Sequence, residues 1–209
     1  MLSRLMLLGP PGAGKGTQAK QIVAETGLMH LSTGDILRDE VARGTELGRS
    51  AKEVMDRGEL VSDELIVGMI RGRIETASSG FLLDGFPRTI AQAEALEEIT
   101  PLDLVINIQL SREEVVKRLT SRRVCRKCGK IYNLHFEPPA DPTTCDACGG
   151  ELIQRDDDKQ DVIENRYTVY DASTAPLIAF YRERGILRDF DGSKGSHAIF
   201  AEVMAILRG

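Results

Sequence analysis

The chain has 209 residues, of which 42% are hydrophobic and 28% charged, and its formal net charge is −5. This length suits one α/β domain with insertions or two small domains, and no apolar run approaches the ~20 residues that cross a bilayer. The N-terminus lacks the pattern of a secretory signal, so we expect a cytoplasmic protein without a membrane partner. The negative charge also argues against wholesale binding of nucleic acid.

A short apolar run and a glycine-rich turn open the chain. Leu5–Leu8 is short enough for a buried strand, and Gly9–Thr17 breaks it before apolar residues resume at helical spacing. A strand, a glycine-rich turn and a helix N-terminus present backbone N–H groups and a positive dipole end to phosphate. Lys15 adds a point charge and Thr17 a hydroxyl for magnesium, whereas Gly16 stands where the general motif has Ser or Thr. The turn predicts a phosphate site, although such turns also join strands to helices without a ligand.

The next segment is predicted to be helical. Residues 31–35 read as a loop, and no strand is predicted between residues 31 and 76. Apolar spacing predicts three helices: one carrying Ile36, Leu37 and Val41, one at Leu47–Met55, and one at Asp63–Ile74 with Ser62 or Asp63 as its cap. We therefore expect a helical excursion after the first strand and helix.

Short apolar strands then alternate with amphipathic helices. The later strands are predicted at Phe81–Asp84, Leu104–Ile108 and Ile186–Phe190. The later helices are predicted after Pro87, at Glu113–Ser121, at Gln160–Arg184 with a bend near Pro176, and at His197–Leu207. This alternation predicts a parallel sheet covered by helices on both faces.

Residues 122–158 interrupt the alternation and contain all four cysteines, as Cys125-x2-Cys128 and Cys145-x2-Cys148. In a cytosolic protein such clustering favours a metal over disulfides. Two such pairs supply four thiolates in the tetrahedral arrangement of structural zinc, with iron or four idle thiols as the alternatives. Four protein ligands leave no open position for a substrate, so we expect a structural metal that folds this segment as a unit.

Several arginines are candidates for holding phosphate groups: Arg38, Arg88, Arg118, Arg122, Arg123, Arg155 and Arg166. Guanidinium groups match phosphate oxygens with paired hydrogen bonds, although any single exposed arginine can serve solubility alone. Asp84 ends an apolar strand, which is where an open α/β sheet places ligand groups. The histidines form no triad and are given no catalytic role.

Four motifs together resemble those of one family. They are Gly9-Pro-Pro-Gly-Ala-Gly-Lys-Gly-Thr17, Ser32-Thr-Gly-Asp35, Phe81-Leu-Leu-Asp-Gly-Phe-Pro-Arg-Thr89 and Thr174-Ala-Pro-Leu177. Their sequences and their order are similar to those of adenylate kinases, and the resemblance extends over nearly the whole chain. The Lys-Gly-Thr ending of the first motif is the usual form in nucleoside monophosphate kinases. The four-cysteine insertion resembles the zinc-bearing lid of many bacterial long-form adenylate kinases.

The resemblance implies a P-loop three-layer α/β sandwich with a central parallel sheet. Its core comprises residues 1–31, 62–121 and 159–209, with a helical AMP-binding insertion at 32–61 and a small zinc-binding lid at 122–158. It further implies reversible transfer of the terminal phosphoryl group of ATP to AMP, which gives two ADP and maintains the adenine nucleotide balance. Mg²⁺ would accompany ATP, Zn²⁺ would be structural, and the protein would be a monomer.

The resemblance also assigns roles to individual residues. Those implied for ATP are Gly12, Ala13, Gly14, Lys15, Gly16, Thr17, Arg118, Arg122, Ile131, Tyr132 and Lys194. Those implied for AMP are Thr33, Arg38, Glu59, Leu60, Val61, Gly85, Phe86, Pro87, Arg88, Gln92, Arg155 and Arg166. Those implied in phosphoryl transfer are Lys15, Arg88, Arg122, Arg155, Arg166 and Asp84, the last ordering the magnesium shell through water. The implied zinc ligands are Cys125, Cys128, Cys145 and Cys148.

Water competes with AMP for the phosphoryl group, so we expect both insertions to close over the nucleotides, with hinges of the lid near Arg122 and Asp158. Two other functions stay open. A related kinase with UMP or CMP as acceptor, or GTP as donor, would share these motifs, although Thr33 favours AMP. A nucleotide-dependent zinc-ribbon adaptor for nucleic acid or protein would bind nucleotide without making ADP.

Overall fold

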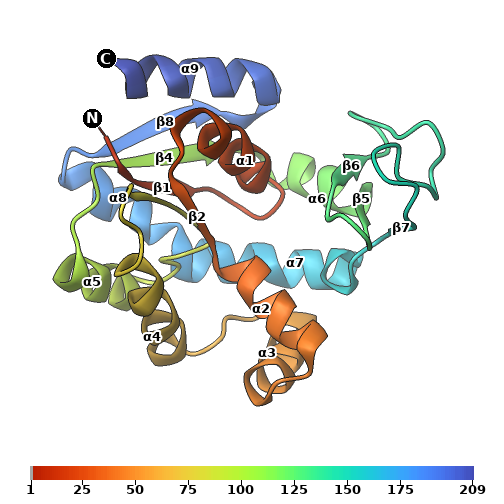
Figure 1. Ribbon diagram of the computed structural model, residues 1–209, viewed down its shortest axis with the longest axis horizontal. Coiled ribbons are helices and arrows are strands. Elements are labelled where there is room, and N and C mark those ends of the chain that lie inside the picture. Colours follow the sequence, from red (N-terminus) through yellow and green to blue (C-terminus); the bar gives the residue numbers. More distant parts are fainter. Residues whose placement is uncertain (1) are drawn as a thin grey trace.

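A parallel sheet forms the middle layer of the protein in the computed structural model, which describes residues 2–209 (Figure 1). From one edge to the other, its strands within these residues are β2 (Met29–Ser32), β3 (Phe81–Asp84), β1 (Arg4–Leu8), β4 (Leu104–Gln109) and β8 (Leu187–Asp191). All neighbouring strands pair in parallel. The predicted α/β fold with a central parallel sheet is confirmed. Because the strands are parallel, their carboxyl ends all lie on the same side of the sheet.

Helices cover both faces of this sheet (Figure 1). On one face lie α1 (Lys15–Thr26) and α9 (Ser196–Arg208), and on the other lie α4 (Asp63–Ile74), α5 (Ile90–Ile99) and α8 (Pro176–Glu183). The side chains of β1 alternate between the two layers, Leu5 and Leu7 packing with the first set and Met6 and Leu8 with the second. Because both faces are buried, β1 is a continuous apolar run. Within residues 2–209, every helix falls short of the length and apolar character that a bilayer span requires.

The remaining elements form two insertions and the helices beside them. Between β2 and α4 lie α2 (Thr33–Arg43) and α3 (Glu46–Asp56), while residues 122–153 contain an antiparallel sheet of β6 (Ile131–Asn133), β5 (Arg122–Cys125) and β7 (Leu152–Ile153). Before and after this sheet come α6 (Arg112–Thr120), the short helix η1 (Asp156–Asp158) and α7 (Gln160–Val169), and η3 (Gly192–Lys194) follows β8. Figure 1 shows α2 and α3 and the small sheet extending from different sides of the layered core.

The prediction of a loop at residues 31–35, with no strand in that segment, is wrong. Strand β2 ends at Ser32, and α2 begins at once, with the Ser32 hydroxyl accepting a hydrogen bond from the Asp35 N–H at 3.3 Å. The segment Met29-His30-Leu31-Ser32 carries no apolar run because β2 is an edge strand, and only its last two residues are buried. Its pairing with β3 defines it as a strand.

The predicted long helix at Gln160–Arg184 is interrupted earlier than its proline suggests. Helix α7 ends at Val169, a π-helical turn covers Tyr170–Thr174, and α8 begins at Pro176. The bond from the Ala175 N–H to the Tyr170 carbonyl spans five residues, at 2.8 Å. The proline opens a new helix, where its missing N–H costs little, and the bend belongs to the π-turn before it.

The close approach of α3 to α2 yields a test of packing. A Cβ atom at Gly48 would lie 2.0 Å from the Glu40 carbonyl oxygen. We expect Gly48→Ala to lower the free energy of unfolding by about 1–3 kcal/mol, because the backbones must separate. Among the described residues, no atom lies within 4 Å of a Cβ at Gly68 in α4, so Gly68→Ala should raise it by about 0.5–1 kcal/mol. Denaturant unfolding measures both, and equal stability of the two variants would contradict this packing.

Candidate functional site

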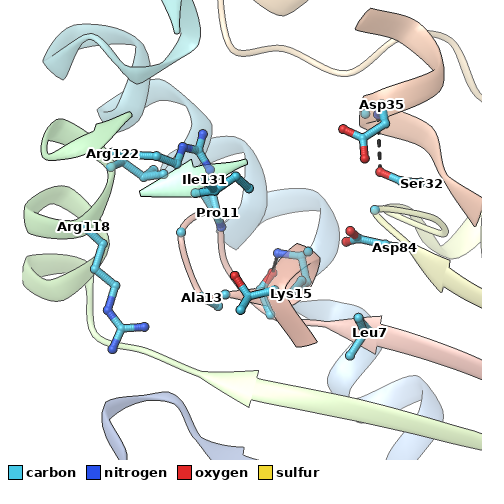
Figure 2. A pocket seen from close by; sticks show the side chains of 18 of the residues that line it. Leu7, Pro11, Ala13, Lys15, Ser32, Asp35, Asp84, Arg118, Arg122 and Ile131 are labelled. Atoms are coloured by element: carbon cyan, nitrogen blue, oxygen red, sulfur yellow. Dashed lines mark hydrogen bonds between the residues drawn. The ribbon is translucent and has the colours of Figure 1, made fainter. Parts of the chain in front are cut away.

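A cavity of about 1200 Å³ opens at the carboxyl ends of β1, β2 and β3. Its walls come from the glycine-rich turn and the start of α1, from the α2–α3 insertion, from α6 and α7, and from the small antiparallel sheet. In Figure 2, Lys15 lies between Asp84 on one side and Arg122 and Ile131 on the other. The cavity therefore runs from one insertion to the other across the glycine-rich turn.

The glycine-rich turn requires glycine at Gly9, Gly12 and Gly14, all of which have positive φ. A Cβ at Gly9 would lie 2.3 Å from the Ile108 carbonyl oxygen, and Gly14, the residue before α1, has φ +91°. The turn brings the first N–H groups of α1, which have no partner within the helix, to the cavity. This geometry suits the phosphate site that the sequence predicts.

The Lys15 ammonium lies inside this turn. It donates hydrogen bonds to the Gly9 and Pro10 carbonyl oxygens at 2.7 and 2.8 Å. Burial lowers the pKa of Lys15 to about 8, against the opposing attraction of the Asp84 carboxylate. A half-buried cation that is bonded only to neutral carbonyls is well placed to take an anionic partner.

Asp84 faces the start of α1 from the end of β3. A Cβ at Gly16 would lie 3.6 Å from the nearer Asp84 carboxylate oxygen, so the glycine keeps the space in front of the carboxylate open. On its other side, His30 Nε2 lies 3.5 Å from the same oxygen. Thr17, one residue further along α1, also lines the cavity. The site thus offers hard oxygen donors beside the turn, which suit Mg²⁺.

Arginine side chains concentrate positive charge in the same cavity. Those that line it are Arg38, Arg88, Arg118, Arg122, Arg126, Arg155 and Arg166. Burial lowers the pKa of Arg88 and of Arg155 to about 10, helped by the guanidinium groups of Arg166 and Arg122 respectively. Both remain charged at neutral pH, so the cavity holds several cations with incomplete hydration. Such a place attracts polyanions.

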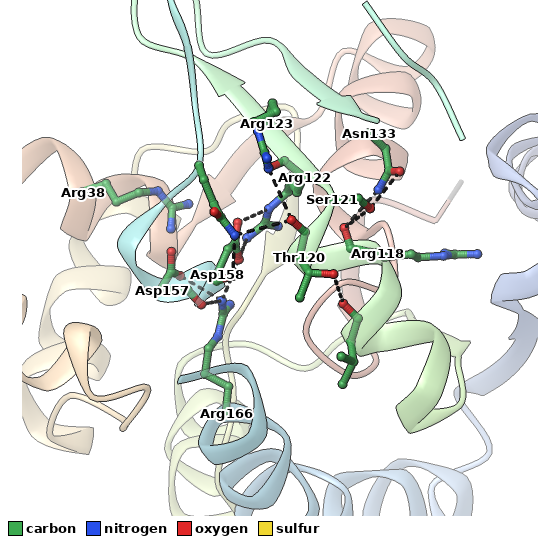
Figure 3. Close-up of polar contacts among 12 residues, drawn as sticks. Arg38, Arg118, Thr120, Ser121, Arg122, Arg123, Asn133, Asp157, Asp158 and Arg166 are labelled. Atoms are coloured by element: carbon green, nitrogen blue, oxygen red, sulfur yellow. Dashed lines mark hydrogen bonds and ion pairs between the residues drawn. The ribbon is translucent and has the colours of Figure 1, made fainter. Parts of the chain in front are cut away.

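Two carboxylates of η1 partly neutralise this charge. Arg122 makes a paired contact with Asp158, at 2.8 and 2.6 Å, and Arg166 lies 2.9 Å from Asp157 and 3.3 Å from Asp158 (Figure 3). Asp158 is fully buried. Although burial opposes ionisation, Arg166 and its neighbours hold the pKa of Asp157 below its usual value. Sequence reasoning missed this role of Asp157, although the run of three acidic residues after Arg155 is a signal for it.

The far end of the cavity is built around Gly85 and Gln92. The Thr33 hydroxyl and the Arg88 Nε both donate to the Gly85 carbonyl oxygen, at 2.8 and 2.7 Å. Glu59, Leu60 and Val61 line the same end.

The structure brings all but two of the predicted nucleotide-site residues onto this cavity. Phe86 is instead fully buried in the core below it, because the turn that presents Gly85 and Arg88 to the cavity points this ring inward. The Lys194 side chain is paired with Glu202 at 2.9 Å, while Gly192, Ser193 and Gly195 around it line the cavity. Arg123, one of the candidate arginines, also lies away from the cavity lining and donates to the Thr120 and Arg122 carbonyls.

The cysteines form a separate cluster in the small sheet. Their four sulfur atoms lie within 4.8 Å of one another, with Cys125 and Cys148 3.4 Å apart and Cys128 and Cys145 3.7 Å apart. The buried Tyr132 hydroxyl lies 3.4 Å from the Cys145 sulfur. Four thiols in this arrangement can hold a tetrahedral metal ion.

This cluster predicts the behaviour of a single substitution. We expect Cys145→Ser to lose most of its bound metal and to melt about 5 °C or more below the unaltered protein, because the site contributes to the folding of a segment with a small core. Activity at low temperature should fall less. Metal analysis and thermal melting measure this effect, and a strong chelator added to the unaltered protein should reproduce the lower melting temperature. An unchanged metal content in the variant would exclude the four-thiolate site.

Comparison with known proteins places the chain in a family. The family model described as adenylate kinase matches residues 7–186. The chain is 53% identical to the adenylate kinase of Archaeoglobus fulgidus, covering 97% of both chains. It is 52% identical to that of Carboxydothermus hydrogenoformans, covering 98% of this chain and 99% of the relative. It is 49% identical to that of Thermodesulfovibrio yellowstonii, covering 98% of each. The chain belongs to the adenylate kinase family.

Proposed function

We propose that this protein catalyses the reversible, magnesium-dependent transfer of the terminal phosphoryl group of ATP to AMP, which gives two ADP. The observation that carries this proposal is the cluster of half-buried arginines between the glycine-rich turn and the Gly85 end of the cavity. One phosphate chain needs the turn alone, whereas cations along the whole cavity suit two phosphorylated substrates placed end to end. Such an enzyme would maintain the balance of adenine nucleotides, and we propose that it acts as a cytoplasmic monomer without membrane or nucleic-acid partners.

The proposed ATP site lies at the glycine-rich turn. The N–H groups of Gly12–Thr17 and the Lys15 ammonium would hold the phosphates, and Arg122 would approach them from the start of β5. Arg118, Ile131 and Tyr132 and the backbone beside Lys194 would surround the adenine. In support, Arg118 already bonds the Gly192 carbonyl oxygen at 2.8 Å, which brings this side chain to the backbone of η3.

The proposed AMP site lies at the Gly85 end. Arg38 and Arg88 would hold the phosphate of AMP. Its nucleoside would be surrounded by residues of α2, of the segment before α4, of the turn after β3 and of α5: Thr33, Glu59, Leu60, Val61, Gly85, Pro87 and Gln92. Arg155 and Arg166 would lie between the two substrates and would contact both.

In this reaction the protein positions the substrates and stabilises charge, and it forms no covalent intermediate. Phosphoryl transfer spreads negative charge over the moving group, and fixed cations stabilise that charge in a dry site. Lys15, Arg88, Arg122, Arg155 and Arg166 would supply these cations. The phosphate of AMP is already anionic, so the acceptor needs no general base.

Two metals fit residues of this chain. Mg²⁺ keeps several water ligands when it is bound with nucleotide phosphates, so Asp84 would order the metal's waters, with the Thr17 hydroxyl nearby. When bound, Mg²⁺ would neutralise phosphate charge. The cysteine cluster fits Zn²⁺, with no position left for substrate, so this metal would be structural. Iron remains the alternative occupant, and metal analysis separates the two.

We also propose that three parts of the chain move against one another. The core would comprise residues 1–31, 62–121 and 159–209, with residues 32–61 closing over AMP and residues 122–158 over ATP. The Arg122–Asp158 contact supports this division of the lid, since it joins the first and last residues of that segment. Closure would exclude water from the phosphoryl group.

The proposed reaction is tested by ADP formation from ATP plus AMP. We expect activity with AMP to exceed that with UMP or CMP, and Lys15→Met to lose at least about a hundredfold in kcat because a cation that follows the moving charge is removed. Circular dichroism checks that the variant stays folded. Nucleotide binding without ADP formation would reject the enzyme in favour of an adaptor, and equal rates with UMP would reject the acceptor.

The pKa of Lys15 predicts a pH dependence of binding. In the free protein Lys15 is charged below pH 8 and neutral above it, since its pKa is lowered to about 8, and bound phosphate favours the charged form. We therefore expect the Kd for ATP to rise about tenfold between pH 7 and pH 9. Titration calorimetry measures this rise. Lys15→Met should bind ATP more weakly and lose the rise, and a rise that persists in this variant would assign it to another group.

A further inference from the structure

Asp63, the first residue of α4, accepts hydrogen bonds from α5 (Ile90–Ile99) and from Thr89, the N-cap residue of α5. Its two carboxylate oxygens accept hydrogen bonds from Gln92 Nε2 at 2.7 Å and from the Thr89 hydroxyl at 2.9 Å. The sequence suggested Ser62 or Asp63 as a cap of α4. However, the Ser62 side chain accepts no bond from the first turn of that helix, and the Asp63 carboxylate is turned toward α5. Asp63 therefore connects α4 to α5 and does not cap its own helix.

The Gln92 side chain is held at both ends. Its Oε1 accepts a bond from the Arg88 N–H at 2.7 Å, while its Nε2 donates to Asp63. A backbone N–H can only donate, and an ionised carboxylate can only accept. Only one of the two amide orientations satisfies both partners, so oxygen and nitrogen of Gln92 have fixed places. Gln92 is 2% exposed and lines the cavity, whereas Asp63 is not among the lining residues.

We propose that Asp63 is a positioning residue for base selection, because it fixes the order of donor and acceptor that Gln92 presents to the acceptor nucleotide. This inference rests on the proposed function, in which the base of AMP lies beside Gln92. With one N–H and one oxygen lone pair already used, the amide keeps one donor and one acceptor. Adenine offers the complementary pair, an exocyclic N–H beside a ring nitrogen that accepts. A 6-oxopurine offers the same two functions in the reverse order.

A 6-oxopurine, with donor and acceptor in the reverse order, is therefore rejected only while the Gln92 amide stays fixed. If Gln92 could rotate by 180° about its last bond, it would present its donor and acceptor to a 6-oxopurine as readily as to adenine. The Arg88 N–H opposes this rotation from one end, and Asp63 opposes it from the other. Without the carboxylate, one of the two constraints is lost, and both the affinity for adenine and the discrimination against the reversed edge should fall.

Asp63 also carries negative charge in the first turn of α4, which stabilises a helix N-terminus without any role in selectivity. Glu64 also lies in the first turn of α4 and is exposed, and its side chain makes no hydrogen bond or ion pair with any of residues 2–209 that the structure describes. Glu64→Ala thus removes a comparable charge and leaves Gln92 untouched. It is the matched control.

The test compares AMP with inosine 5′-monophosphate, a 6-oxopurine nucleotide without a 2-amino group. We expect Asp63→Ala to raise the KM for AMP about tenfold and to lower the AMP-to-inosine-monophosphate ratio of kcat/KM about tenfold, the loss that follows from one hydrogen bond to a charged group. The KM for ATP should be unchanged. Glu64→Ala should change none of these values.

Asp63→Asn separates hydrogen bonding from charge. Its amide oxygen can accept from Gln92 while its NH₂ donates to the Thr89 hydroxyl, so this variant should keep the selectivity of the unaltered protein. If Asp63→Ala fails to fold, Asp63→Ser gives the same test, because its side chain is too short for both bonds. A folded variant of either kind with an unchanged AMP-to-inosine-monophosphate ratio overturns the inference. If the unaltered protein makes no ADP from ATP plus AMP, the proposed function itself fails.

Discussion

Concentrated positive charge in one cavity is the constraint on which the rest of the structure depends. Guanidinium groups from α2, α6, α7 and the segments beside β3 and the small sheet face the same space, with Lys15 at its centre. Like charges repel strongly where water is scarce, so each must be held by its own element. Asp157 and Asp158 offset part of this repulsion. Phosphate groups would offset the remainder, which explains how a chain of net charge −5 binds polyanions.

The sheet provides the rigid base that such a cavity requires. Strand β1 is buried on both faces, so the glycine-rich turn at its end is anchored by packing on either side. The turn passes so close to the Ile108 carbonyl oxygen that a side chain at Gly9 is excluded. Asp84 is anchored in the same way at the end of the neighbouring strand β3. Residues far apart in the sequence thus meet with little freedom to move.

The sequence was informative where a local pattern determines the structure, and uninformative where a distant partner does. Continuous apolar runs identified β1, β3 and β4, and glycine spacing identified the phosphate turn. Strand β2 was missed because pairing with β3, rather than its own composition, makes it a strand. The contact of Asp63 with Gln92 joins residues 29 positions apart, so an acidic residue at a helix start looked like a cap.

The cysteines of the small sheet affect the cavity although they take no part in its chemistry. The buried cluster of this sheet consists of Cys125, Tyr132, Cys145 and Leu152, so two of its four residues are cysteines of the candidate metal site. Such a core is too small to hold three short strands by apolar burial alone, and a tetrahedral metal site would supply the missing stability. Arg122 begins β5, and Arg155 follows β7 by two residues. Fixing β5 against β7 therefore fixes two arginines of the cavity, and the metal would act on catalysis through their placement.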